Sequence, residues 1–168
     1  MGWEVIPYDR KFYRDHFSCG KPSLDNYILR NATKDVNDGA CTCFVIIDER
    51  QRVIAYYTLT AASVPIDDAP QELKRRIKYP HVPVILLGRL TVHSEYKGKG
   101  YGKLLLANSL KRSLQVAKDL VGSMAVIVDP IDEEAEQFYQ KYGFAEIPDS
   151  GRMFMTMSKI EEAFALSR

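Results

Sequence analysis

The sequence lacks long hydrophobic runs, a recognisable leader and a large charge of either sign. Nowhere do about 18 apolar residues follow one another, so no membrane span is expected. The first residues contain neither the charged segment nor the apolar core of a secretory signal. The formal net charge is +1, whereas a generic nucleic-acid coat protein would be strongly basic. We therefore expect a soluble, cytoplasmic protein with no membrane partner.

Cysteine is also scarce, and the three residues are Cys19, Cys41 and Cys43. Cys41 and Cys43 are too close in sequence for a relaxed disulfide, and on a strand both would point to the same side. The three form no metal-ligand array. We predict buried free thiols in a reducing compartment, and no metal site.

Apolar residues make up 46% of the 168 positions, which suits one compact domain over 1–168. Apolar and alternating runs predict strands near 3–7, 41–47, 53–60, 84–92, 124–128 and 153–157. Helical spacing predicts a helix capped by Ser23, a short helix over 71–78, a helix over 132–142, and a long helix with an apolar face of Leu104, Ala107, Leu110, Leu114 and Ala117. This order predicts an α/β fold with a mixed sheet, in which strands 84–92 and 124–128 run parallel.

The most informative segment is the turn between strand 84–92 and the long helix. It holds three glycines and three lysines, at Lys97, Gly98, Lys99, Gly100, Gly102 and Lys103. Glycine leaves the backbone bare, so successive N–H groups can converge on an anion. The helix that follows directs the positive end of its dipole to the same place. The turn therefore predicts a phosphate or pyrophosphate site, with a solvated surface turn as the alternative.

Two common phosphate-binding patterns do not fit this turn. A Walker loop requires Ser or Thr after its lysine, whereas Leu104 follows Lys103. A dinucleotide fingerprint requires G-x-G-x-x-G, whereas the glycines here are spaced G-x-G-x-G. The turn therefore matches neither the Walker motif nor the dinucleotide-binding motif, and these two patterns do not identify its anion.

The turn and the segment 132–144 together resemble the core of the GNAT acetyltransferase family. In that family a Q/R-x-x-G-x-G/A turn binds the coenzyme A pyrophosphate through backbone amides. Lys97 stands at the first position of this motif, and Gly100 and Gly102 are its glycines. The family's second motif, Asn-x-x-Ala-x-x-x-Tyr-x-x-x-Gly-Phe, is matched by Ala135, Tyr139, Gly143 and Phe144, with Asp132 in place of the asparagine.

The resemblance implies the GNAT fold: a mixed, mostly antiparallel sheet of six or seven strands, flanked by helices and splayed between its two central strands. It implies acetyl-CoA as the acyl donor. The residues that it implies for donor binding are Leu90, Thr91, Val92, Lys97, Gly98, Lys99, Gly100, Tyr101, Gly102, Lys103, Asp132, Ala135 and Phe138.

The resemblance also implies direct attack of a primary amine on the thioester. The N–H of Leu90 or Val92 would stabilise the oxyanion, and the Tyr139 phenol would protonate the leaving thiolate. A packing role is the alternative for Tyr139. His93 and Glu95 could each deprotonate the amine or simply be loop residues. Arg89, inside an apolar strand, could form a structural ion pair or orient an acidic acceptor or its phosphate.

Further segments resemble the TacT/AtaT-like branch of the family, namely 17–25, 56–59 and 82–92. Known members of that branch are toxins that acetylate the amino group of aminoacyl-tRNA, and they are often encoded beside a ribbon-helix-helix antitoxin. Three functions follow: an acetyl-CoA-dependent N-acetyltransferase for a primary amine, the same chemistry on aminoacyl-tRNA, or a non-catalytic acyl-CoA-binding domain. The basic run 74–78 could contact RNA or be a solvated helix face. The sequence leaves formation of a homodimer open.

Overall fold

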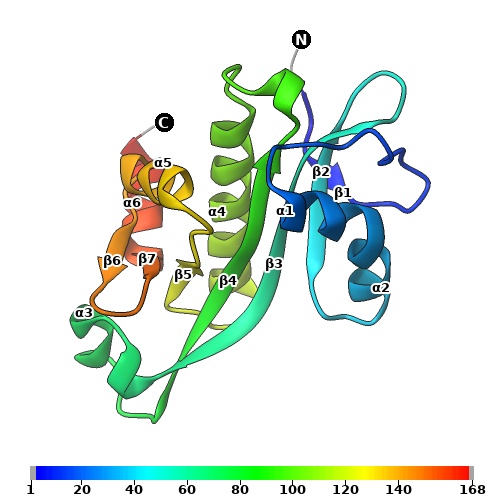
Figure 1. Cartoon of the computed structure of the whole chain (residues 1–168). Coiled ribbons are helices and arrows are strands. Elements are labelled where there is room, and N and C mark those ends of the chain that lie inside the picture. Colours follow the sequence, from blue (N-terminus) through cyan, green and yellow to red (C-terminus); the bar gives the residue numbers. More distant parts are fainter. Residues whose placement is uncertain (1–2, 167–168) are drawn as a thin grey trace. The chain divides into compact units, whose positions relative to one another are not determined.

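The computed structural model describes residues 3–166 and consists of strands and helices in alternation (Figure 1). The strands are β1 Ile6–Pro7, β2 Thr42–Ile47, β3 Val53–Pro65, β4 His81–Val92, β5 Ala125–Val128, β6 Ala145–Ile147 and β7 Arg152–Thr156. The helices are α1 Pro22–Asn26, α2 Ala32–Asn37, α3 Gln71–Lys74, α4 Tyr101–Asp119, α5 Glu133–Lys141 and α6 Met157–Leu166.

The strands form a seven-stranded sheet in the order β1-β2-β3-β4-β5-β7-β6. The pairs β1–β2, β2–β3, β5–β7 and β6–β7 are antiparallel. The pair β4–β5 is parallel, as predicted for strands joined by a helix. The predicted mixed sheet of six or seven strands flanked by helices is therefore confirmed.

The chain divides into two compact units, the first made of residues up to 60 together with 88–109, the second of 61–87 and 110 onward. In the first unit, α1 and α2 lie beside β1 and β2 (Figure 1). Their apolar core includes Tyr27, Ile28, Ala32, Val45 and Tyr56. The three cysteines are buried free thiols, as predicted; Cys43 lies in β2 and Cys41 just before it.

The helical segment 22–37 has the predicted apolar face but not the predicted cap. Pro22 occupies the first turn and Lys21 is the N-cap, without a side-chain hydrogen bond. The expectation that Ser23 caps this helix was wrong, because a proline at the first helical position already suits a helix start. Between α1 and α2 the chain makes a π-helical turn over Tyr27–Asn31.

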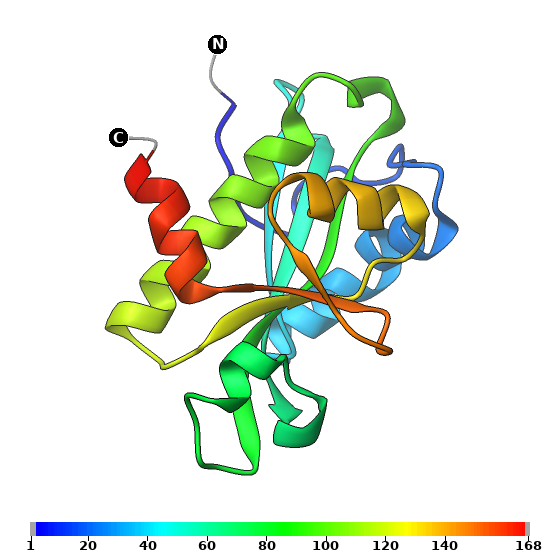
Figure 2. The same ribbon diagram turned by 90° about the vertical axis from the view of Figure 1, so that its left-hand side faces the viewer.

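In the second unit, β5, β7 and β6 lie beside one another, and α6 continues directly from β7 (Figure 2). Buried residues such as Leu73, Val84, Ile127 and Phe154 form its core. The sequence analysis missed β6, which is only three residues long.

The long helix α4 exists as predicted, but its buried face differs from the predicted one. Leu104 and Ala107 are exposed, whereas Leu105, Leu106 and Leu110 are buried. Two small polar residues, Ser109 and Ser113, complete that face. Because three leucines follow one another at 104–106, the apolar pattern is compatible with more than one buried face of the helix. The pattern alone therefore selected the wrong face.

Candidate active site

The glycine-rich turn joins β4 to α4 within the first unit. Gly98 and Gly100 have φ values of +76° and +88°, in the left-handed region that glycine adopts without steric cost. A Cβ built at either position would meet no protein atom within 4 Å. The main chain of the turn is therefore open, at the start of a 19-residue helix whose dipole favours an anion.

Aromatic rings hold the turn in place. The Tyr101 ring meets the rings of Tyr96 and Trp3 edge-on, at centroid separations of 5.8 and 6.0 Å. The Lys99 ammonium lies 5.4 Å from the centre of the Tyr96 ring, a cation–π contact. These contacts order the backbone on both sides of the open glycines. Gly102 and Lys103 lie in the first turn of α4, and Lys103 is exposed.

Lys97, which stands where the family motif has Gln or Arg, directs its side chain to the protein. Its Nζ donates a hydrogen bond to the carbonyl oxygen of Cys19 over 2.6 Å. The side chain thereby joins the turn to the loop that precedes α1. This arrangement directs the Lys97 side chain to the protein and leaves the main-chain amides of the turn exposed around Gly98 and Gly100.

The second half of β4 carries the residues predicted to lie along the donor. Thr91 and Val92 are buried and Leu90 is half-buried. The ladder between β4 and β5 pairs residues 85–87 with 126–128 and ends there, while β4 continues to Val92. Pairing between β4 and β5 thus stops before the end of β4, which is what the predicted splay between these two strands requires.

His93 follows β4, and both of its ring nitrogens are engaged. Nδ1 accepts a hydrogen bond from the Glu95 N–H over 3.1 Å, and Nε2 donates to the His16 carbonyl oxygen over 3.1 Å. The ring is buried and stacks on His16 at 5.3 Å. With both ring nitrogens bonded to backbone groups, His93 holds the backbone and is not arranged as a base. Glu95 is exposed.

The second motif forms α5, in the second unit. Asp132 is its N-cap, and its Oδ1 accepts a hydrogen bond from the Ala135 N–H over 2.9 Å. Asp and Asn are both favoured N-cap residues, which explains why Asp can replace the motif's asparagine. Gly143 has φ of +101° just beyond the C-cap, as predicted for that position.

Tyr139 lies in the middle of α5 between aromatic neighbours. Its ring centroid is 5.4 Å from that of Phe138 and 5.3 Å from that of Phe144, and only 6% of the residue is exposed. Burial raises the pKa of the Tyr139 hydroxyl above its ordinary value. A phenol is protonated at neutral pH even at its ordinary pKa, and the upward shift makes the Tyr139 hydroxyl a weaker proton donor.

The cysteines are poorly suited to carry an acyl group. Burial raises the pKa of the Cys19 thiol and raises that of Cys43 to about 12. A nucleophilic cysteine requires its thiolate, which neither of these groups supplies at neutral pH. Among the residues that the structure describes, no group of three or more His, Cys, Asp or Glu is placed to hold a metal ion. The same residues include no helix long and apolar enough to cross a membrane.

Arg89 is half-buried, and its guanidinium lies 3.5 Å from the centre of the Tyr27 ring. Sequence analysis left Arg89 open between a structural ion pair and an acidic acceptor, and it missed this cation–π contact because the two residues are far apart in the chain. The basic run 74–78 is helical only as far as Lys74, and Arg75, Arg76 and Lys78 are exposed.

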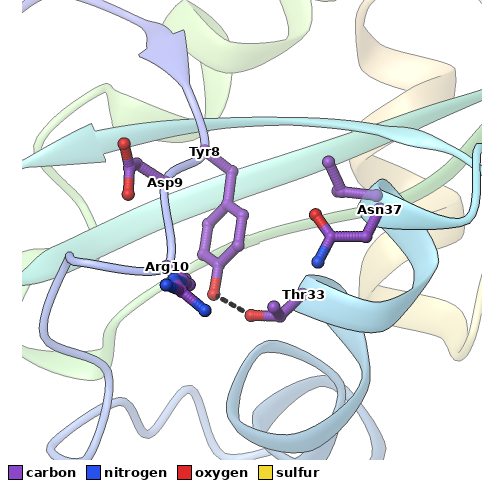
Figure 3. Close-up of a pocket in the computed structure, with 6 residues that line it drawn as sticks. Tyr8, Asp9, Arg10, Thr33 and Asn37 are labelled. Carbon is purple, nitrogen blue, oxygen red and sulfur yellow. Dashed lines mark hydrogen bonds between the residues drawn. The ribbon is translucent and has the colours of Figure 1, made fainter.

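A separate pocket of about 290 Å³ lies in the first unit (Figure 3). It is lined by Tyr8, Asp9, Arg10, Thr33, Val36 and Asn37. The Tyr8 hydroxyl and Thr33 Oγ1 are 2.8 Å apart, which ties the chain after β1 to α2. None of the residues predicted to bind the donor lines this pocket.

Comparison with known families places these observations in context. The model of the family described as "Acetyltransferase (GNAT) domain" matches residues 39–146, more than half of the chain. The chain belongs to the GNAT acetyltransferase family. This acetyltransferase uses acetyl-CoA as its acyl donor and transfers the acetyl group to a primary amine, as the sequence predicted.

Two curated relatives are similar over most of their length. A "tRNA-acetylating toxin" of Mycobacterium tuberculosis is 37% identical over 143 residues, which cover 85% of this acetyltransferase and 84% of the relative. A "Probable toxin TacT" of Sinorhizobium fredii is 29% identical over 157 residues, 88% and 86% of the two chains. The predicted likeness to the TacT/AtaT-like branch is thereby confirmed.

Solved structures share the fold. A tyrosine-to-phenylalanine mutant of KacT superposes with a TM-score of 0.91 at 21% identity, covering 98% of this acetyltransferase and all of that chain. AtaT complexed with acetyl-methionyl-tRNA superposes with a TM-score of 0.88 at 21% identity, covering 97% and 99% of the chains.

Proposed function

We propose that this acetyltransferase acts on the α-amino group of aminoacyl-tRNA and is the toxin of a toxin–antitoxin pair. The observation that carries the proposal is the 37% identity, over 85% of the chain, to a relative named for tRNA acetylation. The structural similarity to AtaT, solved with acetylated methionyl-tRNA, is consistent with it. The partners that follow are acetyl-CoA, an aminoacyl-tRNA and a ribbon-helix-helix antitoxin.

Donor binding is assigned to the turn and to the second half of β4. The amides around Gly98, Gly100 and Gly102 bind the pyrophosphate, supported by the positive φ angles and the open space at Gly98 and Gly100 and by the place of Gly102 in the first turn of α4. The backbone of Leu90 and Val92 receives the pantetheine arm and the thioester carbonyl, since β4 continues beyond its ladder with β5.

Tyr139 is assigned the proton transfer. The neutral amine attacks the thioester carbonyl and the C–S bond breaks as the tetrahedral intermediate collapses. The thiolate of coenzyme A takes a proton from the Tyr139 hydroxyl, and the proton that the amine nitrogen loses to solvent water is returned to the tyrosinate. The support is the position of Tyr139 in the family's second motif, since a phenol is protonated at neutral pH and can give a proton to a thiolate. Asp132, Ala135 and Phe138 shape the start and face of the same helix.

We further propose that residues 1–168 form a single acetyltransferase domain in the cytoplasm. The two compact units share β3, β4 and α4, so neither contains a complete set of these elements. Three buried free thiols suit a reducing compartment.

The decisive experiment is a transfer assay with radiolabelled acetyl-CoA and three separate acceptors: aminoacylated total tRNA, the same tRNA after deacylation, and a mixture of free amino acids. Label should enter only the aminoacylated tRNA, and alkaline hydrolysis should release it as N-acetyl amino acid. Label in free amino acids instead would contradict the proposal. The Tyr139→Phe variant serves as the control for enzyme-dependent transfer.

A further inference from the structure

Arg89 is a half-buried cation with an unusual set of contacts. One face of its guanidinium lies on the Tyr27 ring at 3.5 Å. Within the first unit, no carboxylate of a described residue forms an ion pair with it. A charge that is half removed from water and lacks an opposite charge is costly, so such a group commonly serves a ligand.

The ring beneath Arg89 is itself fixed. The Tyr27 hydroxyl donates to Asp35 Oδ2 over 3.0 Å and lies 3.2 Å from Cys41 Sγ. Tyr27 also stacks on Tyr56, whose hydroxyl donates to the Leu24 carbonyl oxygen over 2.6 Å. The guanidinium therefore rests on a rigid aromatic platform. Its in-plane N–H groups are left for hydrogen bonds, since stacking uses only the faces.

The position of Arg89 on β4 relates it to the reaction. Val92 lies three residues further along the same strand, about 10 Å at the usual rise per residue. The glycine-rich turn proposed to bind the pyrophosphate follows Val92. Arg89 precedes Val92, so along the strand the proposed thioester site lies between Arg89 and that turn. The segment 88–109 contains four basic residues and only one carboxylate, Glu95, and so favours anionic ligands at both ends.

We propose that Arg89 is a positioning residue for the acceptor, and that its guanidinium binds the phosphate on the 5′ side of the terminal nucleotide that carries the aminoacyl ester. This inference rests on the proposed function. A planar guanidinium can hold two oxygens of one phosphate, which fixes both the distance and the direction of the nucleotide. The α-amine of the ester is then directed along β4 toward the acetyl group.

The test uses two small acceptors that differ only in that phosphate. Both are hydrolysis-resistant, amide-linked 3′-aminoacyl-adenosines, one with and one without a 5′-monophosphate. For the parent enzyme, kcat/KM should be roughly 10- to 100-fold higher with the phosphate, the range expected for a charged hydrogen-bonded pair. For Arg89→Gln this ratio should fall to about one, and Arg89→Lys should give an intermediate ratio because it keeps the charge without the planar fork.

Arg50→Gln is the matched control, because it removes another arginine of the same unit, at the exposed turn between β2 and β3. It should keep the ratio of the parent. Calorimetry with coenzyme A separates the two phosphate sources, since Arg89→Gln should retain the parent's affinity if the phosphate belongs to the acceptor.

Several results would overturn the inference. A purely structural Arg89 would lower the rates for both acceptors equally and leave their ratio unchanged in Arg89→Gln. Loss of coenzyme A affinity in that variant would assign the guanidinium to the donor. If the parent enzyme acetylates both compounds equally well, the proposed function stands but the proposed role of Arg89 is refuted. A parent that acetylates neither compound nor aminoacyl-tRNA would refute both.

Discussion

The Lys97 ammonium donates a hydrogen bond to the Cys19 carbonyl oxygen over 2.6 Å. This contact connects the glycine-rich turn to the loop before α1, where the Cys19 N–H donates a hydrogen bond to Asp25 Oδ1 over 2.8 Å. Lys97 occupies the motif position at which the family has Gln or Arg, and its side chain stabilises the turn by bonding the neighbouring loop.

Lys97→Met should weaken coenzyme A binding by less than about fivefold, since an exposed charge contributes at most about 1 kcal/mol. The loop contact is lost, but the amides of the turn remain. Isothermal titration calorimetry measures the change, and a loss of binding beyond 50-fold would mean that the lysine side chain, rather than the main chain, holds the phosphates.

Gly100→Val should lower coenzyme A affinity by more than about 100-fold, because the side chain would enter the space left for the pyrophosphate and remove charge-assisted hydrogen bonds. Gly39→Val is its control. Gly39 has φ of +77° and is equally open, so both variants carry the strain of a left-handed valine, about 1–3 kcal/mol. Only the variant at position 100 should lose affinity in calorimetry, whereas equal losses would point to general destabilisation.

Tyr139→Phe should reduce turnover at least about tenfold and leave coenzyme A affinity nearly unchanged, because only the proton donor is removed. Steady-state kinetics and calorimetry on the same preparation provide both quantities. Phe138→Leu, a change at the neighbouring ring that keeps the Tyr139 hydroxyl, should retain most of the turnover. An unimpaired Tyr139→Phe enzyme would exclude Tyr139 from the mechanism.

Acid should destabilise the protein through His16. Burial lowers the pKa of the His16 imidazole below its ordinary value, and its Nε2 lies 3.1 Å from the Val53 carbonyl oxygen. The unfolded chain binds this proton near pH 6.5 while the folded chain does not, so the free energy of unfolding should decrease as the pH falls below that value. Urea unfolding at pH 7.5 and 5.5 measures the decrease, which should be smaller in His16→Gln. An identical decrease in that variant would contradict the assignment.

Thr58→Val should keep or raise stability, by up to about 1 kcal/mol. Thr58 Oγ1 is buried and has no hydrogen-bond partner in the described part of the chain, so its desolvation is uncompensated. Thr156→Val is the matched change at a buried threonine whose Oγ1 accepts from the Lys159 N–H over 3.2 Å, and it should lose about 1 kcal/mol. Urea unfolding of both compares them, and destabilisation of Thr58→Val would indicate an unseen partner.

Sequence reasoning predicted the elements whose pattern is long or whose turn chemistry is distinctive. The hairpin of β2 and β3, the apolar β4, and the glycine turn followed by α4 all occur close to their expected positions. The motif helix also ends as predicted, because a glycine at position 143 permits φ of +101° after the last turn.

Other features depend on contacts that a linear pattern does not contain. The buried face of α4 includes Ser109, whose Oγ donates to the Leu106 carbonyl oxygen at 2.8 Å, so a polar residue belongs to a face that an apolar pattern does not identify. His93 looked like a candidate base because nothing in its neighbourhood in sequence shows that the His16 carbonyl oxygen occupies one ring nitrogen. The Arg89–Tyr27 stack joins distant segments in the same way.

If the turn binds the pyrophosphate through main-chain amides, as proposed, the side chains around it can be exchanged, because every residue other than proline supplies the same N–H group. What such a loop must preserve is its handedness at Gly98 and Gly100. If the turn binds the donor as proposed, searches for related enzymes should weigh those two glycines above Lys99 between them, and redesign of the neighbouring lysines can tune solubility or nucleic-acid attraction while keeping the proposed donor site.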